Sequence, residues 1–256
     1  MNAKLSTLAI ATLLITAPSL AVELIGQAES NNKQSIVAEV NGVIKSAVLE
    51  PGDNVASNML LASIKTQSFD FELAKKQANI ELAQAELKLK SATFERFQEL
   101  VNKNSLSKND LDVAKADYLN AKANLSLAQI ELQEAKQNLS DTQITSSING
   151  YVVSRNTEVG AWVNQGDLLY QLVNIDTLTI TLMASEHDIK SLKVGQPIQL
   201  WPETHPERKV TSNITRIGVE MDANTHAYPI EIDIENPDYT LKPGMSFYGS
   251  TRISNQ

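Results

Sequence analysis

A repeat that is split in two constrains the fold of this chain more than any other feature. Residues 42–61 are echoed without a gap by residues 150–169, and Asn58 stands where the second copy has Gly166. The other matches pair glycine with glycine and apolar with apolar residues: Gly42 with Gly150, Gly52 with Gly160, Val55 with Val163, Leu60 with Leu168 and Leu61 with Leu169. Asparagine is a common substitute for glycine at positive φ, so both copies predict short strands broken by structural glycine turns.

The stretch between the copies predicts two long helices. It contains neither glycine nor proline from residue 67 to residue 140. Its second part carries a heptad seam, with steps of three and four between Leu111, Ala114, Tyr118, Ala121, Leu125, Ala128, Leu132, Ala135 and Leu139. Its first part has an apolar residue at every seventh position from Leu73 to Val101, but Lys76 and Lys90 interrupt the second row. The polar stretch 102–109 suits an antiparallel hairpin with arms of about thirty residues, roughly 45 Å long.

The topology follows from the repeat and the helices together. Because the hairpin leaves one copy and returns to the other, both copies must meet at its base and build one small β-sandwich. From residue 178 onward, alternating residues predict strands at 178–183, 198–201, 213–217 and 228–234, and one short helix at 185–192 capped by Ser185. Glycine and proline punctuate the connections, which favours a small antiparallel β-barrel.

We therefore predict an α+β fold that is elongated and multidomain. After residue 21, its expected parts are an N-terminal extended segment, a first sandwich half, a helical hairpin, a second sandwich half and a barrel: residues 22–36, 37–66, 67–141, 142–174 and 175–256.

The first twenty-one residues have the features of a cleavable signal peptide. Lys4 supplies a positive charge, residues 5–16 are largely apolar, and Ser19 to Ala21 form a small-x-small cleavage site. We expect export with cleavage after Ala21, with an uncleaved anchor as the alternative. No later segment approaches the length of apolar sequence that a membrane span needs.

Composition excludes several classes of function. The chain has no cysteine, which excludes disulfides, thiolate metal sites, a cysteine nucleophile and lipidation on cysteine. A net charge of −8 gives no basic surface for nucleic acid. With 42% hydrophobic residues and few aromatic ones, several small cores are favoured over one large core.

Taken together, these features resemble the membrane fusion proteins, the periplasmic adaptors of tripartite pumps, and especially those that serve RND-type transporters. The split halves resemble the family's lipoyl-like domain, and Leu241 to Met245 match its Leu-x-Pro-Gly-Met ending. The resemblance implies a periplasmic, peripherally associated protein that links an inner-membrane transporter to a TolC-type outer-membrane channel in multidrug efflux. It also implies a homo-oligomer, in which copies pack side by side into a funnel.

The most specific match lies at the hairpin tip. Family members that dock TolC-type channels carry an arginine, a leucine four residues later and a serine seven residues after that, and Arg96, Leu100 and Ser107 fit this spacing. The resemblance thus implies that these three contact the channel, although Phe97 replaces the leucine that often follows the arginine. Arg96 and Leu100 share one helix face. Ser107 also suits an N-cap with Asp110 as a weak partner, and Leu100 and Phe97 also suit the seam.

Enzymatic and metal-binding functions find no support in the residues. Residues 186–188 form a Glu-His-Asp run that cannot converge on one point, and His205 and His226 lie in expected loops, so we expect no metal site and no cofactor. A lipoyl-type carrier would need a lysine at the turn that joins its halves, and the hairpin occupies that junction. We find no Ser/His/Asp arrangement and no phosphate-binding loop, and we expect no enzyme.

Two alternatives to the RND-linked adaptor stay open. One is the adaptor of an ABC-type exporter, which uses the same parts, and the other is a self-associating periplasmic coiled-coil scaffold without a transport role. Many RND-linked adaptors have a further membrane-proximal domain, for which only residues 22–35 and 250–256 remain here. The sequence therefore leaves the mode of transporter contact open, together with the exported substrate and the copy number.

Overall fold

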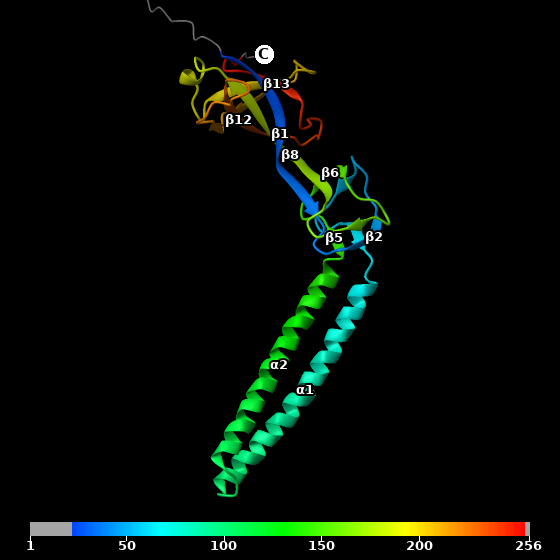
Figure 1. Ribbon diagram of the computed structural model, residues 1–256. Coiled ribbons are helices and arrows are strands. Elements are labelled where there is room, and N and C mark those ends of the chain that lie inside the picture. The colour runs from blue at the N-terminus through cyan, green and yellow to red at the C-terminus, as the bar shows by residue number, and fades with distance from the viewer. Residues whose placement is uncertain (1–21, 254–256) are drawn as a thin grey trace, which may run out of the picture. The chain divides into compact units, whose positions relative to one another are not determined.

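The computed structural model describes residues 22–253, which form two compact units (Figure 1). The hairpin unit is Asn32–Ile175, and the barrel unit combines the described residues up to Asn31 with those from Asp176 onward. The predicted signal peptide lies outside the described residues, and the sequence-based domain ranges stay a prediction.

The chain contains thirteen strands and three helices within the described residues. The strands are β1 (Glu23–Val37), β2 (Gly42–Ala47), β3 (Asn54–Val55), β4 (Leu60–Ile64), β5 (Gln143–Thr145), β6 (Gly150–Arg155), β7 (Trp162–Val163), β8 (Leu168–Ala184), β9 (Pro197–Pro202), β10 (Val210–Asn213), β11 (Arg216–Ile217), β12 (Tyr228–Glu235) and β13 (Ser246–Ser250). The helices are α1 (Gln67–Asn102), α2 (Lys108–Ser140) and the short 3-10 helix η1 (Ile189–Ser191).

The two long helices lie side by side as an antiparallel hairpin (Figure 1). Their facing rows are those of the predicted heptads: Ile80 and Ala83 of α1 and Ala114, Ala121, Ala128, Leu132 and Ala135 of α2 are buried. Near the turn, the rings of Phe94 and Tyr118 stack at 5.6 Å between centroids. The predicted hairpin and its apolar seam are thus confirmed.

At the base of the hairpin, the two copies of the repeat interlock in one sandwich. Gly42 of β2 pairs with Val163 of β7, and the equivalent residues Gly150 of β6 and Val55 of β3 pair in the same way. Each copy therefore lends a short strand to the other. One buried core holds residues of both copies, including Ile44, Val55 and Leu61 from the first and Val152, Val163 and Leu169 from the second. Neither copy can bury its apolar face alone, which explains why the chain carries both.

The glycines of the repeat serve two different purposes. Gly52, Gly160 and Gly166 have positive φ angles of 98°, 89° and 93° in turns, and Asn58 has a φ of 65°. Gly42 and Gly150 are not turn residues, however, because each begins a strand. A Cβ atom would lie 2.5 Å from Cγ2 of Ile64 at Gly42 and 2.1 Å from the carbonyl oxygen of Val173 at Gly150. At these two positions the requirement is close packing and not a turn conformation.

The barrel unit is an antiparallel sheet with the strand order β10-β9-β13-β1-β8-β12-β11, and β1 and β8 each continue into the hairpin unit. Apolar side chains of alternating residues fill its core: Leu178, Ile180, Leu182, Ile198, Leu200, Ile230, Ile232 and Phe247 are buried to 1% exposure or less. The side chain of Asn236 bonds both the N–H and the carbonyl of Leu241, and the N–H of Gly244 donates to the carbonyl of Ala28 at 2.8 Å. The Leu-x-Pro-Gly-Met segment is therefore a turn that ties the end of the chain to β1.

The extended segment expected at residues 22–36 contains most of strand β1. Two sequence-based predictions for the barrel unit are corrected. The strand expected at 213–217 is broken, because Ile214 bonds with Gly195 and Gln196 beside β9, whereas Thr215 turns to Glu231 of β12. The expected helix at 185–192 is shortened to the single 3-10 turn η1, whose N-cap is Asp188 and not Ser185. The hydroxyl of Ser185 accepts from the N–H of Asp188 in the turn that precedes η1.

Among residues 22–253, no helix combines the length and the apolarity that crossing a membrane requires.

Candidate functional site

The tip of the hairpin is a tight turn whose geometry the backbone defines. The N–H of Ser105 donates to the carbonyl of Leu100 at 2.8 Å and that of Asn104 to Val101 at 2.9 Å, which ends α1. Asn104 has a φ of 56°, a left-handed conformation that asparagine tolerates. Ser107 then caps α2 by accepting from the N–H of Asn109 at 3.1 Å, so hydrogen bonds define both sides of the turn.

Two of the three residues expected at the channel contact are exposed. Arg96 and Ser107 are exposed, and Leu100, one turn beyond Arg96 on α1, is half-buried. Phe97 is also half-buried, in the row that faces α2. The tip therefore offers a guanidinium group and a polar turn to a partner, beside an apolar side chain that is only partly covered. Ser107 keeps its capping role whatever else it touches.

A second apolar row, which is not among the sequence-based predictions, runs along the outer face of each helix. We call it the outer row. On α1 it consists of Phe71, Ala78, Leu82, Ala85, Leu89 and Ala92, and on α2 of Val113, Ala116, Ala123, Leu127 and Ile130, all exposed. Its residues follow one another in steps of three, four and seven, like those of the seam, but on the opposite face of each helix. This second apolar periodicity is the sequence signal by which the outer row can be predicted. Arg96 follows Ala92 at the tip end of the row on α1.

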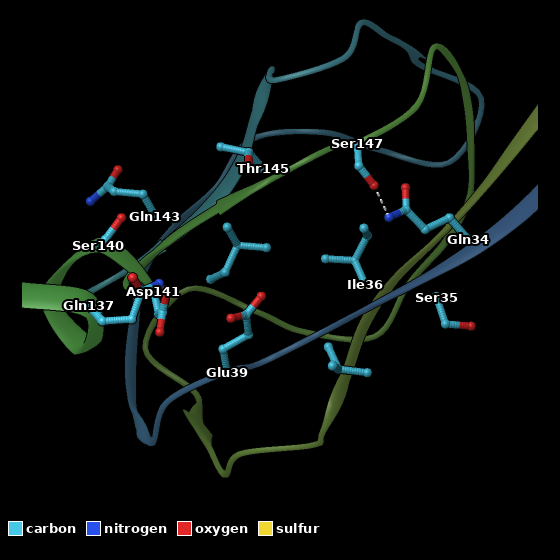
Figure 2. Close-up of a pocket in the computed structure, with 12 residues that line it drawn as sticks. Gln34, Ser35, Ile36, Glu39, Gln137, Ser140, Asp141, Gln143, Thr145 and Ser147 are labelled. Carbon is cyan, nitrogen blue, oxygen red and sulfur yellow. Dashed lines mark hydrogen bonds between the residues drawn. The ribbon is translucent and has the colours of Figure 1, made fainter. Parts of the chain in front are cut away.

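The hairpin unit also contains a polar hollow of about 400 Å³ where α2 meets the sandwich. Figure 2 shows its lining, which includes Gln34 of β1, Glu39 in the loop after β1, Gln137 and Asp141 at the end of α2, and Gln143 of β5. Gln34 donates to the hydroxyl of Ser147 at its rim. Two carboxyl groups line the hollow without a basic side chain among them, but within the described part of the chain no three His, Cys, Asp or Glu residues are grouped to hold a metal ion.

Two family models match separate parts of the chain. The EMRA α-helical hairpin domain matches residues 55–149, and the CusB-like β-barrel domain matches residues 179–254. These ranges contain the hairpin with its tip and most of the barrel unit.

Relatives extend the similarity over most of the chain. The macrolide export protein MacA of Yersinia pestis is 28% identical over 249 residues, and the multidrug efflux pump subunit AcrA of Escherichia coli K12 is 25% identical over 241 residues. These alignments cover 90% and 88% of this chain but only 67% and 60% of the relatives, so the chain spans about three fifths to two thirds of their length.

A solved structure has a similar fold. The crystal structure of MacA from Actinobacillus actinomycetemcomitans matches with a TM-score of 0.74 and 26% identity, over 90% of this chain and 77% of that one. Split sandwich, inserted hairpin and barrel are thus a known combination.

Proposed function

Because the chain belongs to the membrane fusion proteins, the family of periplasmic adaptors, we propose that it links an inner-membrane transporter to an outer-membrane channel in an efflux complex. The observation that carries the proposal is the inserted hairpin, a rod whose far end is a defined tip. Relatives described as efflux and export proteins support it. Such a protein acts by assembly and sealing, so the proposal assigns no catalytic step to the chain.

Within this function, we assign the docking of a TolC-type channel to Arg96, Leu100 and Ser107. An arginine presents a planar fork of donors that suits carboxylates and backbone carbonyls at the end of another helical structure. No ion pair engages Arg96 among residues 22–253, so its charge is available to a partner. Leu100 adds a partly covered apolar surface within one helical turn.

The test is in-cell photocrosslinking from a probe at position 100, with mass spectrometry to identify the partner. We expect a crosslink to an outer-membrane channel that Arg96→Glu abolishes. Lys88→Glu is the matched control, since it makes the same charge change on an exposed α1 residue about 12 Å nearer the base. Crosslinks only between copies of this chain, with a channel present, would sink the adaptor proposal and favour the coiled-coil scaffold.

We further propose that copies of the chain pack side by side through the outer rows. The seam turns the two helices toward each other, so their outer faces point in opposite directions and each hairpin has two apolar flanks. Packing α1 of one copy against α2 of the next is a heterologous contact, which closes into a ring when the rotation permits. Leucine and alanine alternate on α1, a pattern that allows a second helix to approach closely.

Sedimentation velocity tests this packing. The double variant Leu82→Glu with Leu89→Glu is expected to shift the protein to smaller species, because it buries two carboxylates in the contact. The control, Gln77→Glu with Gln84→Glu, adds the same charge to exposed positions on another face of α1 and should leave the distribution unchanged. Equal distributions for the two variants would exclude the outer row of α1 as the contact.

For the transporter we propose one of the RND type, with an ABC-type exporter as the alternative. The match of the barrel to a CusB-like domain supports the first, and the macrolide export relative keeps the second open. Affinity purification of the chain from detergent-solubilised membranes distinguishes them by the class of transporter recovered. We also propose a periplasmic location, which fractionation of cells that express the full chain would test.

A further inference from the structure

Two lysines occupy inward positions of the hairpin seam, where an apolar row would otherwise be continuous. Lys76 and Lys90 stand in the α1 row that also contains Phe69, Ala83 and Phe97, and their side chains are only 26% and 34% exposed. A charged group in a seam lowers stability relative to an apolar one unless it finds a partner, so each lysine requires an explanation.

Each lysine forms an ion pair across the hairpin. Nζ of Lys76 lies 3.1 Å from Oε2 of Glu131, and Nζ of Lys90 lies 2.8 Å from Oδ2 of Asp117. Fourteen residues, or two heptads, separate the lysines, and fourteen separate the acids. Both pairs therefore belong to one and the same antiparallel register.

An apolar heptad seam alone does not define that register. If α2 slides by seven residues, every seam position still faces a seam position, so slippage by one heptad is the natural error. The acids break this degeneracy, because the α2 row that faces the lysine row reads Asn138, Glu131, Asn124, Asp117 and Asp110. In the observed register it sets an acid against each lysine and Asn124 against Ala83.

A slip in either direction destroys this match. In one direction both lysines face asparagines, Asn124 and Asn138, while Glu131 faces Ala83 and Asp117 faces Phe97. In the other direction Lys90 meets Asp110, but Lys76 meets Asn124 and Glu131 faces Phe69. Only the observed register pairs both lysines with carboxylates of α2. Lys76 also lies 3.6 Å from Glu72 of its own helix, and that contact is the same in every register.

We infer that Lys76 and Lys90 are positioning residues, which set the register of the hairpin through Glu131 and Asp117. Half-exposed pairs of this kind add little to stability, and their effect lies in the penalty they impose on wrong pairings. The inference deepens the proposed function and rests on it in one respect: the register decides whether Arg96, Leu100 and Ser107 meet at one tip.

A disulfide assay can read the register directly, because the chain has no cysteine of its own. Ala83→Cys with Ala128→Cys, two residues of one buried cluster, reports the observed register. Ala83→Cys with Ala135→Cys, one heptad further along α2, reports the slipped one. Each pair is equilibrated in a glutathione buffer, and the fraction of disulfide is measured by mass spectrometry.

The decisive variant moves the acids by one heptad without changing composition or net charge: Asp117→Asn, Asn124→Asp, Glu131→Asn and Asn138→Glu. We expect the ratio of slipped to observed disulfide to rise about tenfold, the order that two half-exposed ion pairs supply together. The turn residues Asn104 and Ser107 are unchanged, so the shift is attributable to the pairs.

The control exchanges the partners in place: Lys76→Glu with Glu131→Lys, and Lys90→Asp with Asp117→Lys. It should keep the ratio of the unmodified chain. An unchanged ratio in the acid-shifted variant would overturn the inference and assign the register to the turn, and a slipped control would overturn it equally. Neither readout involves a channel, so a failure here is distinct from a failure of the docking proposal.

Discussion

Two buried threonines of the hairpin unit differ in whether their hydroxyl groups are satisfied. Thr142 is fully buried and donates to the carbonyl of Leu139 at 2.7 Å, at the end of α2. Thr157 is 5% exposed, and its Oγ1 has no hydrogen-bond partner. The repeat supplies an internal reference, because the residue equivalent to Thr157 in the first copy is Leu49, which is buried at 7% exposure. The fold therefore accepts an apolar side chain at this position.

We predict that Thr157→Val stabilises the sandwich by about 1 kcal/mol, since it removes an unpaired buried hydroxyl group. Thr142→Val, the matched control, should destabilise by about 1 kcal/mol, because it leaves a helix-end carbonyl with one partner fewer. Urea unfolding followed by circular dichroism measures both changes. A destabilised Thr157→Val would mean that the hydroxyl has a partner, such as a bound water molecule.

At the scale of the element, the charged pairs of the hairpin carry a pH dependence. The hydrogen bond to Glu131 raises the pKa of Lys76 above its ordinary value of 10.5, and the hydrogen bond to Asp117 raises that of Lys90. A raised lysine pKa contributes stability that is complete below the unfolded value and is lost as the pH rises through the folded value. Burial also raises the pKa of the Tyr170 hydroxyl above its ordinary value of 10.0. The sandwich therefore loses stability too as the pH rises above 10.0.

We therefore predict that the thermal midpoint of the hairpin falls as the pH rises beyond about 10.5. In the double variant Lys76→Gln with Lys90→Gln, the thermal midpoint should fall less over the same pH interval. Adding Tyr170→Phe to this variant should reduce the remaining fall of the midpoint further. Circular dichroism at the helical minimum, recorded from pH 8 to pH 11.5, measures this. The same slope in the chain with and without the two lysines would contradict it.

Elements that arise from a pattern within one segment could be predicted from the sequence, whereas contacts between distant segments could not. The hairpin could be predicted because its seam repeats every seven residues, and the sandwich because its glycines recur in register. The partners of Lys76 and Lys90 could not, since Glu131 and Asp117 stand outside the apolar rows and become neighbours only after the helices pair. The break at Ile214 was missed for a similar reason: the chain changes its pairing partner there, while the alternation of side chains continues.

The candidate site, too, could be predicted only in part from the sequence. Arg96, Leu100 and Ser107 were identified from a resemblance, and the structure adds the exposed Arg96 and the capping bond of Ser107 without testing the contact itself. The outer row is also present in the sequence, but the stronger seam accounts for both helices by itself, so the outer row is not needed to predict them. The requirement for glycine at Gly42 and Gly150 comes from distant atoms of Ile64 and Val173, which no local pattern reveals.

At the scale of the whole molecule, the hairpin is an insertion into a complete domain. The N–H of Ile64 donates to the carbonyl of Thr142 at 2.8 Å, and Ser63 pairs with Gln143, so the chain leaves and re-enters the sandwich at neighbouring strands. The core of the sandwich comes from the two copies of the repeat and the segments beside them, without a buried residue of α1 or α2, and Phe69 of α1 is only partly buried against it.

Excision of the hairpin should therefore leave a folded sandwich. We predict that a chain with Asn-Gly in place of residues 65–141 keeps cooperative unfolding, because these two residues suit a tight turn between β4 and β5. Proton NMR dispersion and urea unfolding measure this, and a crosslink to a channel should be absent. An uncooperative transition with collapsed NMR dispersion would mean that the sandwich depends on the rod.

The split repeat has a further consequence for the order in which the chain acquires structure. Helix pairing joins residues that are near in sequence and is fast, whereas the sandwich must wait for strands that are synthesised roughly a hundred residues apart. Until β6 to β8 emerge, the apolar residues of the first copy have nothing to cover them, and they are open to chaperones. A hairpin that closes early brings Ile64 to Thr142 and removes most of the entropy lost in joining the two copies. Before the protein reaches any partner, we therefore expect the hairpin to speed the folding of the sandwich into which it is inserted.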